Sequence, residues 1–120
     1  MNPAVAPHRA RLRVAVVFAL VIWAACSIPG ESLPESILLS WDKLWHLLAF
    51  AMLAVLWVRA GFGFGAVAGG TFAFGAGIEV WQHFAPIGRF LDPLDVLANG
   101  AGIAIGLACV AVAGAEGRRS

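Results

Sequence analysis

The chain has 120 residues, of which 61% are hydrophobic and 12% are charged. With a mean hydropathy of +0.86, it has too little polar surface to coat a soluble globule, so we predict a membrane protein with a single domain. The formal net charge of +1 and the absence of a long basic tract argue against nucleic-acid binding.

Four apolar segments follow one another, separated by stretches rich in proline, glycine and charge. None alternates apolar and polar residues as a half-buried strand does, and a helix needs roughly 20 residues to cross a bilayer. The predicted transmembrane helices are Leu12–Ile28, Leu44–Val58, Phe62–Phe84 and Leu94–Ala115. The short step Ala60–Gly61 predicts a tight hairpin between the second and third. We therefore expect an all-α fold, with four helices in an antiparallel bundle.

The first segment has a rival interpretation. Arginines precede an apolar run that ends in "WAACS", which is similar to a signal peptide with Cys26 as an acylated residue. Trp23 fits poorly where such a signal carries an aliphatic residue, and cleavage would leave only three spans. We therefore favour a retained helix, with Cys26 and Cys109 as small core residues rather than disulfide partners.

Basic residues predict the orientation of the chain, because cytoplasmic loops carry an excess of lysine and arginine. One side of the predicted bundle has Arg9, Arg11, Arg13, Arg59, Arg118 and Arg119. The other side has only Lys43 and Arg89, together with several acidic residues. We expect a multi-pass protein of the bacterial inner membrane, with both termini in the cytoplasm and an acidic external face.

Polar residues gather near the external ends of three predicted helices. At a rise of about 1.5 Å per residue they lie at similar depth, and within each helix they share a face at spacings of three or four residues. The groups are Asp42 with His46, Glu79 with Gln82 and His83, and Asp95 with Asn99. We therefore predict one polar layer. An ionised Glu79 left in lipid would cost several kcal/mol, so it should find a partner, be protonated or line a wet cavity.

Small residues predict how two of these helices pack. Gly102 and Gly106 continue the face of Asp95 and Asn99, so that face should point into the bundle. In the third segment small residues recur every four positions and predict close approach to a neighbour, at Gly65, Gly69, Ala73 and Gly77.

The segments "DKLWHLLAF" and "IEVWQHFAPIGRFLDPLDVLANGAG" resemble the VanZ-like family of small membrane proteins. The resemblance covers about Val14 to Val112. It implies a signature set of candidate ligand-binding residues: Asp42, Lys43, His46, Glu79, Gln82, Arg89, Asp92, Asp95 and Asn99. The family takes its name from a protein linked to teicoplanin resistance, so the resemblance implies a link to glycopeptide resistance. We expect a minimal version of the family, without extra spans or an appended domain.

Each signature residue also has a structural interpretation. Asp42 and Asp95 can cap helices, Lys43 and Arg89 can anchor at the interface, and Asn99 can bond another helix. As a function we favour a polar pocket at the outer leaflet that binds an envelope lipid, a lipid-linked cell-wall precursor or a glycopeptide-related ligand, because guanidinium and ammonium groups bind phosphate.

Other functions are less well supported by the sequence. The alternatives are a structural or partner-binding protein, compatible with a homodimer, and an enzyme acting on a phosphate-bearing lipid. No nucleophile motif supports catalysis, and the first helix lacks the glutamate that small multidrug exporters carry. His46, His83, Glu79 and Asp95 have the chemistry for zinc but no recognised spacing, so we predict neither metal nor cofactor.

Overall fold

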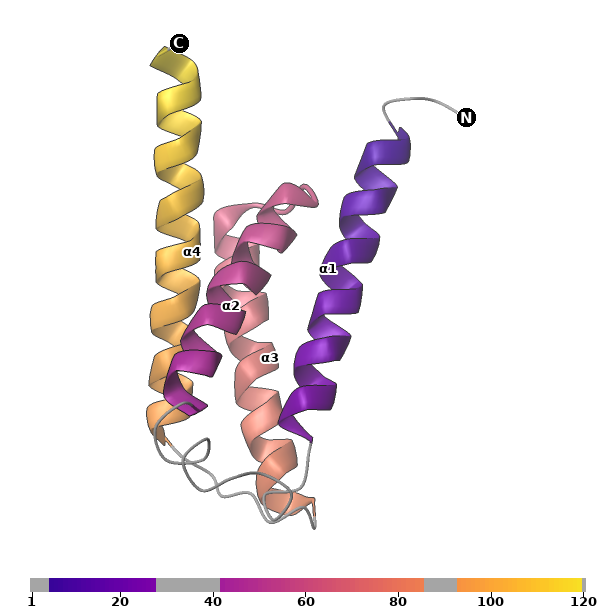
Figure 1. The fold of residues 1–120 in the computed structure, drawn as a ribbon, viewed down its shortest axis with the longest axis vertical. Coiled ribbons are helices and arrows are strands. Elements are labelled where there is room, and N and C mark those ends of the chain that lie inside the picture. Colours follow the sequence, from indigo (N-terminus) through magenta and orange to yellow (C-terminus); the bar gives the residue numbers. More distant parts are fainter. Residues whose placement is uncertain (1–4, 28–41, 86–92, 120) are drawn as a thin grey trace.

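The structure is a computed structural model that describes residues 5–27, 42–85 and 93–119. These residues form four α-helices and no strand: α1 (Val5–Cys26), α2 (Asp42–Arg59), α3 (Phe64–Phe84) and α4 (Pro93–Arg119). Successive helices run in opposite directions, so the start of α1 and the end of α4 lie at the same end of the molecule (Figure 1). The predicted all-α fold is confirmed for this part of the chain.

The turn between α2 and α3 is as tight as the sequence predicts. Gly61 has a φ of 109°, which side-chain-bearing residues rarely adopt, so glycine allows the chain to leave α2 at this point. The amide of Gly61 donates to the carbonyl of Val58 at 3.0 Å, and the amide of Ala60 donates to Leu56 at 3.0 Å. The two helices therefore form a hairpin.

The most extensive packing in the bundle is between α2 and α4. At Gly102, a Cβ atom would collide with the backbone carbonyl of Leu47, and at Gly106 with that of Ala51. Close backbone approach of this kind is what glycines at this spacing allow. The predicted inward face of α4 is therefore confirmed, and it fixes the register of α2 against α4.

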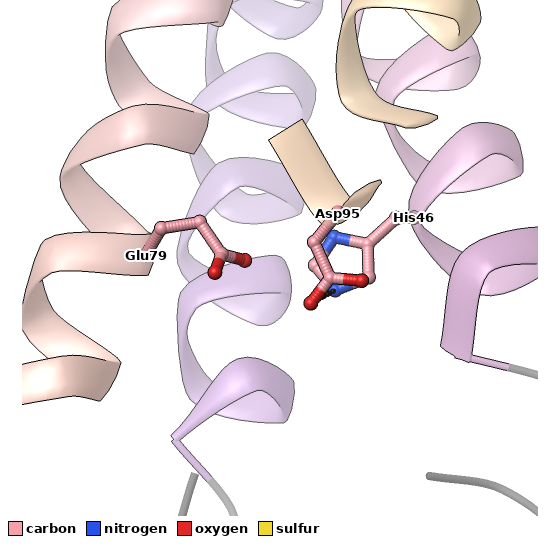
Figure 2. Close-up of side chains that lie close together, drawn as sticks. All are labelled: His46, Glu79 and Asp95. Atoms are coloured by element: carbon pink, nitrogen blue, oxygen red, sulfur yellow. Dashed lines mark ion pairs between the residues drawn. The ribbon is translucent and has the colours of Figure 1, made fainter. Parts of the chain in front are cut away.

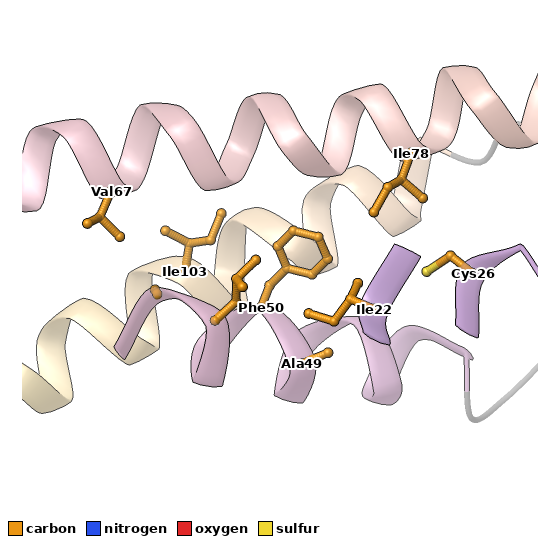
Figure 3. Close-up of a cluster of buried hydrophobic side chains, with 9 residues drawn as sticks. Ile22, Cys26, Ala49, Phe50, Val67, Ile78 and Ile103 are labelled. Carbon is orange, nitrogen blue, oxygen red and sulfur yellow. The ribbon is translucent and has the colours of Figure 1, made fainter. Parts of the chain in front are cut away.

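A cluster of nine buried apolar residues joins all four helices (Figure 3). Phe50 of α2 is its largest side chain and is 1% exposed. Ile22 and Cys26 bring α1 into the cluster, and Ile103 brings in α4. Cys26 and Cys109 are both free thiols, and Cys26 lies in this core as expected, whereas Cys109 is exposed, so the prediction that it is a core residue is wrong.

The small-residue stripe of α3 does not pack as predicted. A Cβ atom added at Gly65, Gly69 or Gly77 would meet nothing within 4 Å, and Ala73 is exposed. The buried face of α3 instead contains Gly75, Glu79 and Gln82 among its residues. Small residues permit close approach but do not attract a neighbour, whereas exposing the polar residues of the other face to lipid would be costly.

Membrane-spanning character is strongest in α4. Among the described helices, only its segment Pro93–Ala115 is long and apolar enough to cross a membrane by itself. Arginines lie along the first half of α1, α2 has charged residues at both ends, and α3 contains Glu79 and many glycines. These residues lower the hydropathy or raise the charge of the other three helices.

An apolar cavity of about 330 Å³ lies between α1, α2 and α3. Its lining includes Ala19, Leu53, Trp57, Val67 and Phe74. Thr71 also lines it, but its hydroxyl donates to the backbone carbonyl of Val67 in its own helix. The cavity therefore presents almost no polar group to an occupant.

Candidate functional site

Three of the predicted polar residues converge from three different helices (Figure 2). His46 of α2, Glu79 of α3 and Asp95 of α4 are 1%, 1% and 5% exposed. One imidazole nitrogen and one oxygen from each carboxylate lie within 4.8 Å of one another. Figure 2 shows Glu79 pointing from α3 toward the other two side chains. The prediction that these helices contribute to one polar layer is confirmed.

Lys43 forms an ion pair with Asp95 at the edge of this layer. The Nζ atom of Lys43 lies 2.6 Å from Oδ1 of Asp95, and the two side chains are 31% and 7% exposed. Lys43 lies in the first turn of α2 and Asp95 in the first turn of α4, so the pair joins the starts of two helices. The ammonium compensates one of the two buried carboxylates while remaining partly accessible.

Asn99 orients the imidazole of His46. The Nδ1 atom of His46 lies 2.8 Å from Oδ1 of Asn99, and both residues are buried. A carboxamide oxygen only accepts hydrogen bonds, so Nδ1 must carry the proton and donate it. In the neutral ring Nε2 then has the lone pair, and this atom lies 3.7 Å from Oδ2 of Asp95. As expected, Asn99 joins two helices by a hydrogen bond.

Gln82 and His83 have different environments. The buried Gln82 donates from Nε2 to the backbone carbonyl of Cys26 at 2.7 Å, and so ties the end of α1 to α3. His83, which the sequence places beside Glu79, is exposed and contacts Phe84. His83 is therefore not one of the residues that line the layer, because its side chain near the end of α3 is exposed.

Three signature residues add little to this geometry. Arg89 and Asp92 lie outside the described residues, and Asp42 is the first residue of α2. Their predicted part in ligand binding stays a prediction. Asp42, Lys43 and His46 do share the first turns of one helix, as the sequence spacing requires.

Phe50 and Gly75 support the layer and were not predicted from the sequence. The Phe50 ring stacks on His46 with centroids 6.5 Å apart. Gly75 lies beneath Asn99, because a Cβ atom there would be 2.8 Å from Asn99 Nδ2 and 3.0 Å from the Phe50 ring. The available signal was spacing: Gly75 precedes Glu79 by one helical turn, and Phe50 follows His46 by one turn.

Replacing Gly75 with alanine tests this support. We expect Gly75→Ala to lower the free energy of unfolding by about 1–2 kcal/mol, because the methyl group would push Asn99 away from His46. Gly77→Ala is the control, since a Cβ atom there meets nothing within 4 Å. Thermal unfolding in detergent, followed by tryptophan fluorescence, compares the two. Equal midpoints would show that Asn99 does not pack on Gly75.

Comparison with known proteins identifies the family. The family model VanZ/LLP1 matches residues 8–114, which covers all three clustered residues and both partners Lys43 and Asn99. Searches of curated proteins and of solved structures found no match. The predicted family resemblance is confirmed by the family model, and the chain belongs to the VanZ/LLP1 family.

Proposed function

We propose that this chain is a four-span membrane protein that holds a phosphate-bearing envelope lipid, or a lipid-linked cell-wall precursor, at the outer leaflet. Membership in the VanZ/LLP1 family indicates a membrane protein, and α4 is apolar enough to span. Large apolar side chains are also exposed on every helix, for example Leu20, Leu48, Phe72 and Leu97. So much exposed apolar surface suits contact with lipid rather than water.

Charge supports the proposed orientation. Arg59 ends α2 at the end of the bundle where α1 begins, so it lies at the same end as the arginines of the first half of α1 (Figure 1). Lys43 and the buried carboxylates lie at the opposite end. Under the positive-inside rule the polar layer then faces the outer leaflet. Glycopeptide drugs target such precursors, so we include a link to glycopeptide resistance in this proposal.

The single observation that carries the proposal is the position of Lys43, a partly exposed cation at the edge of a buried polar layer, with an apolar cavity farther along the bundle. Lys43 can contact a phosphate, for which an ammonium is a common partner. The cavity residue Leu53 lies seven residues after His46, about 10 Å nearer the other end of the bundle. Phe50 connects the two regions, since it contacts both His46 and the cavity residue Phe74. A lipid could therefore place its headgroup at Lys43 and its hydrocarbon chain in the cavity.

Lipid retention tests the proposal. Native mass spectrometry of the purified wild type should show one phosphate-bearing lipid beyond the bulk detergent-exchangeable lipids. Lys43→Gln should lose most of it, because the phosphate loses its cation, whereas Arg59→Gln at the far end of the same helix should retain it. Arg89→Ala, chosen from the sequence, should also reduce retention. If wild type and Lys43→Gln carry the same lipids in the same amounts, the lipid site is disproved.

A second pair of variants tests the cavity. Gly70 lines the cavity and a Cβ atom there meets nothing within 4 Å, so Gly70→Leu should fill the space without a clash with the backbone. Gly69→Leu is the control, because Gly69 is exposed and equally uncrowded. Retention should fall in Gly70→Leu and not in Gly69→Leu. Equal retention would place the hydrocarbon chain elsewhere.

A further inference from the structure

We propose that His46, Glu79 and Asp95 bind a divalent transition-metal cation, with zinc as the best match. The three residues come from three helices, and each is at least 95% buried. One nitrogen and two carboxylate oxygens converge within 4.8 Å. Three such protein ligands with one further position open is the arrangement of catalytic zinc sites, in which imidazole and carboxylate groups both serve.

The geometry between His46 and Asp95 suits a shared cation better than a direct hydrogen bond. Nε2 of His46 and Oδ2 of Asp95 are 3.7 Å apart, which is too long for a hydrogen bond. Two ligands of a tetrahedral zinc ion, at bond lengths of about 2.0–2.2 Å, are separated by roughly 3.4 Å. These two atoms are therefore almost at the spacing that zinc requires. A change of side-chain torsion in Glu79 would bring its carboxylate to the third ligand position.

Asn99 provides the supporting contact that metal-binding histidines have. Such a histidine donates its second ring N–H to a fixed acceptor, which sets the tautomer and aims the other nitrogen at the metal. His46 Nδ1 donates to Asn99 Oδ1 at 2.8 Å, which leaves Nε2, the ring nitrogen nearer the Asp95 carboxylate, as the atom that would bind a metal.

The charge of the cluster also favours a bound cation. Glu79 and Asp95 supply two negative charges, and Lys43 compensates one of them. Ionised groups are expensive to bury in a low-dielectric interior, and a cation that contacts both carboxylates would offset that cost. Two carboxylates and an imidazole from separate helices are a donor set that a metal uses fully, whereas a proton needs only one of them.

Metal binding is measured with the metal alone. Wild-type protein in detergent, stripped by a chelator, should bind one Zn²⁺ per chain by native mass spectrometry and by titration calorimetry. The Co²⁺-substituted protein should show the visible absorption of a site with nitrogen and oxygen ligands. Glu79→Gln, which keeps the side-chain shape, and His46→Gln should each weaken binding at least 100-fold. Asn99→Leu should weaken it about 10- to 100-fold.

Two further variants separate a metal site from a structural polar cluster. His83→Gln should bind as the wild type does, because His83 is exposed and outside the cluster. Lys43→Met should bind Zn²⁺ several-fold more tightly, since the ammonium 2.6 Å from Asp95 competes with the metal for that carboxylate. Equal binding by wild type, Glu79→Gln and His46→Gln would overturn the proposal. A wild type that binds no Zn²⁺ would overturn it as well.

The metal site goes beyond the proposed lipid function and does not depend on it. Zinc binding is measured without lipid, and lipid retention is measured on protein as purified. Loss of one with retention of the other therefore identifies which proposal fails.

Discussion

Gly102→Ala is expected to disrupt the packing of α2 against α4. The added methyl group would occupy the position of the Leu47 carbonyl, and two helix backbones cannot yield as a flexible side chain can. We expect a loss of about 3 kcal/mol in the free energy of unfolding, at the upper end of the usual cost of overpacking. Adding Gly106→Ala, which collides with Ala51 in the same way, should separate the two helices.

The measurement must report tertiary packing rather than helix content. Helices in an apolar medium keep their internal hydrogen bonds even after they separate, so far-ultraviolet circular dichroism would change little. Tryptophan fluorescence is suitable, because Trp57 and Trp45 lie on α2. Gly114→Ala is the matched control: a Cβ atom there meets nothing within 4 Å, and alanine is favoured over glycine in a helix by about 1 kcal/mol. If Gly102→Ala and Gly114→Ala melt alike, α2 and α4 do not approach this closely.

The same contact determines whether the polar layer can form. Asp95, Asn99, Gly102 and Gly106 are all buried on one face of α4. With the two glycines against α2, Asp95 is brought to Lys43 and Asn99 is brought to His46. Gly102→Ala should therefore also lower lipid retention and zinc binding, although it contacts neither ligand.

The sequence predicts the helices and the inward face of α4 because both depend on local spacing. Apolar runs separated by Pro and Gly define four helices, and residues four positions apart share a face. The ends of helices are harder to predict. The first apolar segment begins at Leu12, whereas α1 begins at Val5, since the intervening arginines are good helix formers although they are not apolar.

Choosing which face meets which neighbour requires tertiary information. The sequence predicts that the Gly65–Gly77 stripe of α3 packs against a neighbour and that His83 borders the polar layer. Both are exposed in the structure. Glu79 and Gln82 determine the inward face of α3 instead, because leaving a carboxylate or an amide in lipid without a hydrogen-bond partner costs more free energy than leaving a glycine there. The partner of Gln82, the backbone carbonyl of Cys26, has no sequence signature at all.

Asp95→Leu is expected to lower the free energy of unfolding by about 3 kcal/mol, the low end of the cost of breaking a buried ion pair. The cost lies at the low end because the Lys43 side chain is 31% exposed and can turn toward polar surroundings. Adding Lys43→Met removes the ammonium that has lost its partner. The double variant should return to within about 1 kcal/mol of the wild type, since a well-packed apolar pair often replaces a buried ion pair without loss. The free energies of unfolding of the wild type, the two single variants and the double variant, measured by thermal unfolding, form a double-mutant cycle that tests this expectation.

The double variant also separates structure from function. Asp95→Leu alone cannot, because a protein that unfolds more easily loses its ligands for that reason. A double variant that is as stable as the wild type but retains neither lipid nor zinc would show that Lys43 serves lipid binding and Asp95 serves zinc binding, beyond joining α2 to α4. A stable double variant that keeps both ligands would show that the Lys43–Asp95 pair only holds the two helices together. Arg59→Met removes a charge from the opposite end of α2 and should change neither lipid retention nor zinc binding, so it controls for net charge.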